Sequence, residues 1–116
     1  MTGPWRVQFV DLSLEDIWEP ANVRRFVEEH GYIPWALCRT HADDPNNGGV
    51  HDICPLCYRL VGRVNFQGHG YGQAEWAFNG NYDRPTLSPS VLAYRDGFHC
   101  WVTDGQIIDA GTPPHG

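Results

Sequence analysis

Two pairs of side chains have the types and the spacing of metal ligands. Cys38 and His41 are separated by two residues, and so are Cys54 and Cys57. A pair at this spacing folds into a tight turn that presents both side chains to one ion, and two such turns complete a tetrahedral shell. Zinc suits mixed thiolate and imidazole ligands. The spacing therefore predicts one zinc ion bound by Cys38, His41, Cys54 and Cys57.

The fourth ligand of this predicted site stays open, because His51 lies close to Cys54 and is an alternative to His41. Cys54 and Cys57 are alternatively packed thiols, or a redox pair, which would require a βαβ context with a helix starting at the motif. A stretch that alternates like a strand follows instead. Four protein ligands leave no position for water, so the predicted ion is structural.

A second group of residues has the types needed for nucleophilic catalysis. Ser90 lies in a Pro-rich segment, and His99 lies in an alternating stretch on the face that points away from the core. Ser90 as nucleophile and His99 as general base, oriented by Asp104 or Asp109, would form a hydrolytic site. The alternative is that Ser90 hydrogen-bonds the backbone of a turn and that His99 is solvated on an open sheet face.

Two further possibilities concern the remaining histidines and the last cysteine. An open metal site that uses His69, His99 and His115 would activate water, although their spacing matches no known motif. Cys100 belongs to the face that alternation assigns to the core, so we expect a buried, unreactive thiol there.

Composition indicates one domain, 1–116, with many turns. The chain has 116 residues, 13 Gly and 9 Pro, a length and a composition that favour β structure and loops over a helical bundle. We divide it into an N-terminal strand and helix (1–37), zinc knuckles (38–57) and an antiparallel sheet (58–116).

Charge and hydropathy restrict the kinds of partner and the cellular compartment that we expect for this chain. The formal net charge is −6, with 14 acidic against 8 basic side chains, whereas affinity for nucleic acid depends mostly on Lys and Arg. We therefore expect a protein partner rather than a nucleic acid. No segment has the length of a membrane span or the apolar core of a signal peptide. Four cysteines without such a signal indicate the cytoplasm.

The elements that must position these residues are mostly strands. Alternation predicts strands over 5–12 and 58–66 and around Trp76–Phe78, and then three strands over 91–94, 98–103 and 106–109. Asp96-Gly97 and Asp104-Gly105 are hairpin signals between the last three. An apolar stripe from about Pro20 to His30, followed by Gly31, predicts a helix. The predicted fold is α+β: mainly an antiparallel β-sheet, with one N-terminal helix and a zinc-knuckle (zinc-ribbon-like) loop.

Several strings of the second half resemble a known family. They are Trp76-Ala77-Phe78-Asn79-Gly80, Arg84-Pro85-Thr86-Leu87-Ser88-Pro89-Ser90, and His99 with Val102-Thr103-Asp104-Gly105. Together they resemble the BubE-like family of small bacterial and phage proteins, which are often labelled "ammonia monooxygenase". Some members accompany bacterial ubiquitin-like conjugation genes, and a peptidase role is proposed for them. The resemblance covers about residues 54–115 and implies roles for Cys54, Cys57, Ser88, Ser90, His99, Asp104 and His115.

The chain departs from that family pattern at two places. Phe98 stands where many relatives have Cys, and Pro113-Pro114-His115 stands where they have Cys-Thr-His. These departures favour binding over catalysis, so our first hypothesis is a zinc-stabilised module that binds another protein. The second is a hydrolase or peptidase that uses Ser90 and His99 on the tail of a ubiquitin-like protein. The third, a nucleic-acid-binding zinc domain, is disfavoured by the charge.

Overall fold

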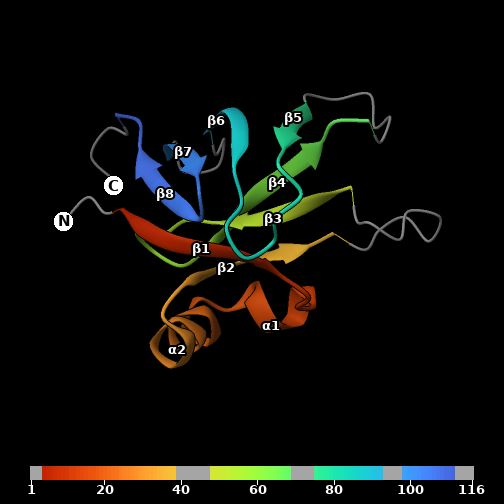
Figure 1. Cartoon of the computed structure of the whole chain (residues 1–116). Coiled ribbons are helices and arrows are strands. Elements are labelled where there is room, and N and C mark those ends of the chain that lie inside the picture. Colours follow the sequence, from red (N-terminus) through yellow and green to blue (C-terminus); the bar gives the residue numbers. More distant parts are fainter. Residues whose placement is uncertain (1–3, 39–47, 69–74, 93–97, 112–116) are drawn as a thin grey trace.

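The computed structural model describes residues 4–38, 48–68, 75–92 and 98–111, and eight strands within these ranges close into a barrel (Figure 1). The elements in chain order are β1 (Trp5–Val10), α1 (Leu14–Trp18), α2 (Pro20–His30), β2 (Ile33–Leu37), β3 (Gly49–Ile53), β4 (Leu60–Phe66), β5 (Glu75–Phe78), β6 (Leu87–Leu92), β7 (His99–Thr103) and β8 (Gln106–Asp109).

Each strand pairs with the next one along the chain, and β8 pairs back onto β1. The β1–β2 and β4–β5 pairs are parallel, and the other neighbours, including β8 and β1, are antiparallel. The predicted α+β composition dominated by strands is confirmed. The sheet is nevertheless a closed barrel with two parallel pairs, which the sequence analysis did not predict.

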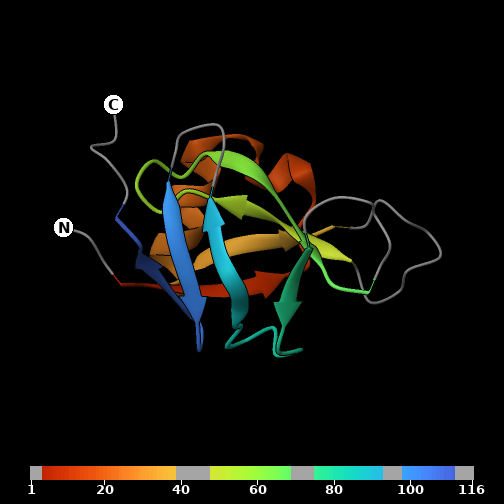
Figure 2. The same ribbon diagram turned by 90° about the horizontal axis from the view of Figure 1, so that it is seen from above.

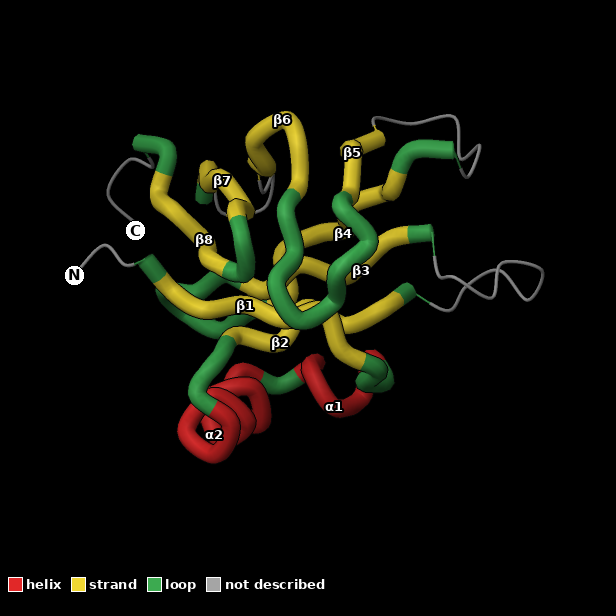
Figure 3. Tube along the Cα trace, viewed as in Figure 1, coloured by secondary structure: helices red, strands yellow, loops and turns green. Residues whose placement is uncertain are grey.

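Two helices cover one side of the barrel, next to β1 and β2 (Figure 3). In α1 a capping box joins Ser13 and Asp16, and α2 begins at Pro20 and ends at Gly31 in the left-handed conformation, φ 80°. The predicted helix from Pro20 to His30 is therefore confirmed, but the prediction of a single N-terminal helix is wrong because Ser13 caps a separate short one. Neither helix is long and apolar enough to cross a membrane.

The barrel interior is filled by inward-facing side chains of its strands, among them Phe9, Trp35 and Phe66. Phe9 is 3% exposed and lies between Trp35 and Phe66, with ring centroids 5.8 and 5.9 Å away. The indole N–H of Trp35 donates to the backbone carbonyl of Ile53 at 3.1 Å. This packing leaves each strand one inward and one outward set of residues.

The predicted faces of β7 are confirmed. Cys100 and Val102 are buried, whereas His99 is half-buried and Trp101 and Thr103 are exposed. Figure 2 shows β6 and β7 side by side, and Figure 1 shows both strands on the side of the barrel away from the helices. The outward face of β6 and β7 is therefore not covered by α1 or α2.

Candidate active site

A bulge in β6 places Ser90 beside β7. The ladder pairs Leu87 with Val102 and then Val91 with Cys100, so residues 88–90 of β6 lie opposite Trp101 alone. Such bulges re-aim side chains and are common next to active sites. Val91 is buried, and the neighbouring Ser90 therefore points to the outward face. Ser90 was expected in a turn, but it lies in a strand.

Ser90 and His99 are in hydrogen-bond contact on this outward face. The distance from His99 Nε2 to Ser90 Oγ is 2.7 Å, in a partly buried environment. With Nε2 unprotonated, the hydroxyl donates to it, which is the geometry in which an imidazole accepts a proton from an attacking serine. The indole N–H of Trp76 donates to the backbone carbonyl of Ser90 at 3.1 Å and holds the bulge from the β5 side.

Asp104 does not lie with this pair. It occupies the turn between β7 and β8, with φ 49°, and its Oδ2 accepts a hydrogen bond from Arg84 Nη2 at 2.7 Å. At about 3.3 Å per strand residue, Asp104 lies roughly 16 Å from His99 along β7. The predicted role of Asp104 in orienting His99 is therefore not supported by the geometry.

Asp109, the other carboxylate considered for this role, faces the other way. It lies directly opposite Cys100 in the β7–β8 ladder, so the two share the inward face. Its Oδ1 accepts a hydrogen bond from the backbone N–H of Gly111 at 2.9 Å. Ser90 and His99 are thus the predicted catalytic residues that the structure brings into contact.

Cys100 is the buried thiol that the alternation predicted, with 1% of its surface exposed. Burial, together with the negative charges of Asp52 and Asp109, raises the pKa of Cys100 to about 12. A thiol with such a pKa stays protonated at neutral pH and is a poor nucleophile. Cys100 is therefore a buried core residue and not a second nucleophile.

Cys38 and Cys54, one from each predicted zinc-ligand pair, lie at opposite ends of β3 in the described structure. The backbone N–H of Cys38 donates to the carbonyl of Gly49 at the start of β3, whereas Cys54 follows the end of β3. At about 3.3 Å per residue the two cysteines lie roughly 16 Å apart, but thiolates on one zinc lie within about 4.6 Å of each other. This register argues against a single ion bound by both Cys38 and Cys54.

The second pair keeps the local shape of a ligand turn. The N–H of Tyr58 donates to the carbonyl of Cys54 at 2.8 Å, and Tyr58 has φ 62° immediately after Cys57. Within the described ranges no three His, Cys, Asp or Glu side chains group as metal ligands. The candidate ligands His41, His69 and His115 lie outside those ranges. His51, the alternative fourth ligand, lies opposite Ala36 in the middle of β3.

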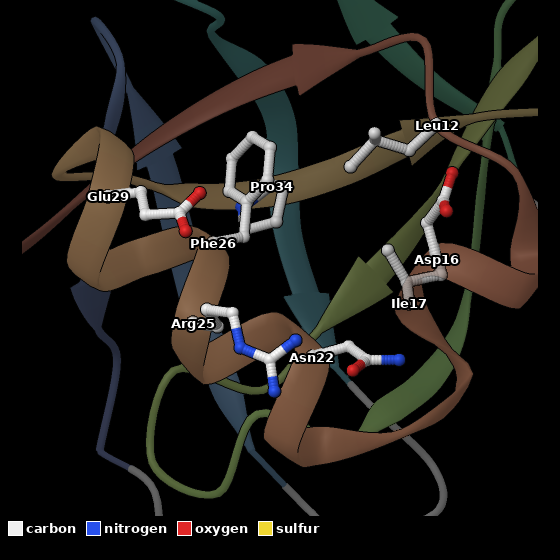
Figure 4. A pocket seen from close by; sticks show the side chains of 8 residues that line it. All are labelled: Leu12, Asp16, Ile17, Asn22, Arg25, Phe26, Glu29 and Pro34. Atoms are coloured by element: carbon white, nitrogen blue, oxygen red, sulfur yellow. The ribbon is translucent and has the colours of Figure 1, made fainter.

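A hollow of about 400 Å³ lies on the helix side of the barrel (Figure 4). Its lining combines apolar side chains, among them Leu12 and Phe26, with the charged Arg25 and Glu29. The residues that line the hollow come from α1, α2, β2 and the segment before α1, and the helices lie across the barrel from β6 and β7 (Figure 1). It therefore does not serve Ser90 and His99, whose surroundings are the outward face of the sheet.

Trp76 is a site neighbour that could not be predicted from the sequence, whereas Trp101 could. Alternation had already placed Trp101 on the same face as His99, so its position was visible in the sequence. That Ser90 lies next to Trp101 could not be predicted from the sequence, because the bulge that aligns the two residues depends on the pairing of β6 with β7. The contact between Trp76 and Ser90 likewise depends on strand pairing.

Comparison with known families shows which family the chain matches. The model of a family described as "Bacterial ubiquitination-like system serine protease (BubE)" matches residues 27–110. The match includes both Ser90 and His99 and extends N-terminally beyond the region in which the resemblance was noted. No curated protein and no solved structure matches the chain.

Proposed function

Because this chain belongs to the BubE family, we propose that it is a serine peptidase in which Ser90 is the nucleophile and His99 the general base. The observation that carries the proposal is the 2.7 Å contact between His99 Nε2 and Ser90 Oγ. It lies on a face that the helices leave uncovered, so that an extended polypeptide can reach it. Catalysis thus moves ahead of the interaction module as the leading hypothesis.

The proposed reaction is a two-step acyl transfer. Ser90 Oγ attacks the carbonyl carbon of the scissile amide while His99 Nε2 accepts the hydroxyl proton. The tetrahedral intermediate then collapses, the C–N bond breaks, and the imidazolium gives its proton to the leaving amine. A water molecule attacks the acyl-enzyme, with His99 accepting a proton from the water and returning it to Ser90 Oγ, and the new carboxylic acid leaves.

The proposed substrate is the tail of a ubiquitin-like protein. The family description names a bacterial ubiquitination-like system, and such a tail is an extended segment that fits an open sheet face. On this proposal the ubiquitin-like protein is also the protein partner that the charge favoured. An amide bond beyond the tail, in an extension or a conjugate, would be the bond that is cut.

The decisive test compares Ser90→Ala with Ser88→Ala. Both serines lie in the β6 bulge, and Ser90 is the one whose Oγ lies 2.7 Å from His99 Nε2. We expect Ser90→Ala to lower kcat/KM on a ubiquitin-like protein with a C-terminal peptide extension by at least about 1,000-fold. Ser88→Ala should stay within a few-fold of wild type, and a fluorophosphonate probe should label every protein except Ser90→Ala. Equal activity of Ser90→Ala and wild type, with circular dichroism unchanged, would refute the assignment.

A zinc ion on the Cys54–Cys57 turn is a separate proposal. It is supported by the turn geometry at Tyr58 and by thiolate chemistry, which suits zinc; any further ligands would come from outside the described residues. Elemental analysis of purified protein tests it. We expect Cys57→Ser to remove the zinc and Cys38→Ser to retain it. Zinc-free wild-type protein that is fully folded would disprove the proposal.

A further inference from the structure

The outward face of β6, β7 and β8 carries three large apolar side chains in water. They are Leu92, Trp101 and Ile108, which are 45%, 46% and 39% exposed, respectively; we call them the apolar strip. Contiguous exposed apolar surface on a soluble protein commonly marks a place where a ligand or another protein binds. The position of the apolar strip in the strand ladder indicates which kind of ligand would bind there.

The apolar strip is continuous with the proposed catalytic pair. Trp101 lies directly opposite Ile108, and Leu92 lies directly opposite His99. Directly opposed residues have Cβ atoms about 4.5–5.5 Å apart. Trp101 also lies opposite the bulge that carries Ser90. A polypeptide whose carbonyl reaches Ser90 Oγ must therefore lay neighbouring residues over the strip.

The outward positions of β7 and β8 around the strip carry no acidic or basic side chain apart from His99. They are His99, Trp101, Thr103, Gln106 and Ile108. The exposed Arg6 of β1 lies opposite Gln106, at the β1 edge of this surface. A charged substrate side chain laid over Leu92 and Trp101 would lose water, and the outward positions of β7 offer it no acidic or basic partner other than His99. An aliphatic or aromatic one would lose only unfavourable contact with water. The chemistry of the strip thus discriminates against charge.

We propose that the apolar strip binds a large apolar side chain of the protein substrate and selects for it next to the bond that Ser90 cleaves. This inference rests on the proposed function. Trp101 is two residues from His99 along β7, about 6.6 Å at 3.3 Å per residue. The selected side chain therefore lies within two residues of the scissile bond. Trp101, Leu92 and Ile108 are specificity-determining residues, and they take no part in proton transfer.

The test uses fluorogenic peptides that are identical except for Leu or Glu at one position, scanned over two residues on each side of the bond. At one of these positions wild type should prefer Leu by at least about tenfold in kcat/KM, the factor expected for one apolar contact. Trp101→Ser should reduce this preference below about threefold by raising KM for the Leu peptide. Ile108→Thr, a second variant, should shift it in the same direction.

Trp18→Ser is the matched control, because Trp18 is an exposed tryptophan (64%) on α1, away from β7. It should leave the Leu preference unchanged. Hydrolysis of p-nitrophenyl acetate, which has no side chain to recognise, should be equal in wild type and Trp18→Ser. An unchanged Leu preference in both Trp101→Ser and Ile108→Thr overturns the inference.

The failure of this inference and the failure of the proposed function give different results. If Ser90→Ala abolishes ester and peptide hydrolysis while the Leu preference survives in Trp101→Ser and Ile108→Thr, the peptidase assignment is supported and the role of the apolar strip is refuted. If Ser90→Ala retains hydrolysis, the catalytic assignment falls. Calorimetry with Ser90→Ala protein then tests the strip alone, and equal or absent binding of the Leu and Glu peptides overturns the inference.

Self-association is the alternative use of this surface. If wild type is a dimer and Trp101→Ser converts it to a monomer, the strip binds a second copy of the chain, and the inference is overturned.

Discussion

At the scale of single residues, the site depends on where two side chains point. Ser90 and His99 lie on neighbouring antiparallel strands. Both side chains point outward, because the adjacent residues Val91 and Cys100 are buried. Their polar atoms meet at 2.7 Å. Asp104 belongs to the same β7–β8 hairpin but lies in its turn, paired with Arg84.

We predict that Asp104→Asn leaves catalysis nearly unchanged. The side chains of Arg84 and Asp104 are 67% and 66% exposed, and exposed ion pairs stabilise proteins by only about 0–1 kcal/mol. Asn also tolerates the positive φ of this turn. His99→Gln should instead lower kcat by at least about 1,000-fold, because the general base is lost. Steady-state kinetics of the two variants decide the matter: a comparable loss in both would restore Asp104 to the site.

The buried thiol of Cys100 leads us to predict how stability depends on pH. Its pKa is raised from 9.0 to about 12 in the folded protein, mainly by burial. Between these values the folded state holds the proton that the unfolded state releases, so this group's contribution to stability falls as pH rises from 9.0 towards 12. At pH 8.5, iodoacetamide should modify Cys100 only after denaturant has unfolded the protein, as read by mass spectrometry of peptides. Rapid labelling of Cys100 in folded protein would contradict its burial.

At the scale of elements, regular and irregular pairing have different consequences. The regular β7–β8 hairpin turns at Asp104 and Gly105, both with positive φ, as Asp-Gly sequences favour. The irregular β6–β7 ladder holds the nucleophile. At the start of β3 the strands approach so closely that a Cβ on Gly49 would collide with the backbone carbonyl of Val64 on β4.

We predict that Gly49→Ala destabilises the protein by about 1–3 kcal/mol, because neither the new methyl group nor the carbonyl of Val64 has room to move. Gly31→Ala, at the end of α2, meets open space and should cost only about 1 kcal/mol for its left-handed backbone. Urea denaturation monitored by tryptophan fluorescence measures both. A smaller effect at Gly49 than at Gly31 would show that β3 and β4 are further apart than described.

Prediction succeeded for elements whose residues alternate or carry caps. The helix from Pro20 to His30 and the strand from Gln106 to Asp109 have the predicted bounds. β2 was missed because it is buried on both faces: the barrel interior covers one face and the helices cover the other. Its residues, Ile-Pro-Trp-Ala-Leu, therefore show no alternation. β3, where both faces are also mostly buried, was missed for the same reason.

At the scale of the whole molecule, the barrel is closed by the two ends of the described chain. β1 and β8 are paired through Trp5 with Ile107 and Arg6 with Gln106, and the N–H of Val7 donates to the carbonyl of Gly105 at 2.9 Å. Ile107 also lies opposite Val102 on β7. Its fully buried side chain thus joins the strand that carries His99 to the N-terminal strand.

We predict that Ile107→Ala lowers the free energy of unfolding by about 2–5 kcal/mol, since it removes buried methyl groups and leaves a cavity at the closing pair of strands. Ile108→Ala is the matched control, because the next residue is 39% exposed and points outward. It should change stability by less than about 1 kcal/mol. Chemical denaturation curves provide both values, and equal losses would argue against closure between β1 and β8.

The sequence by itself determined the properties that depend on neighbouring residues. Alternation assigned Cys100 to the core and His99 and Trp101 to the opposite face, and the strings around Ser90 and His99 identified the family. Contacts between distant segments were decided only by the tertiary structure. Strand register brought Ser90 to His99 and separated Cys38 from Cys54 by the length of β3. Register depends on which strands pair across the closed barrel, and ligand spacing along one chain carries no record of it.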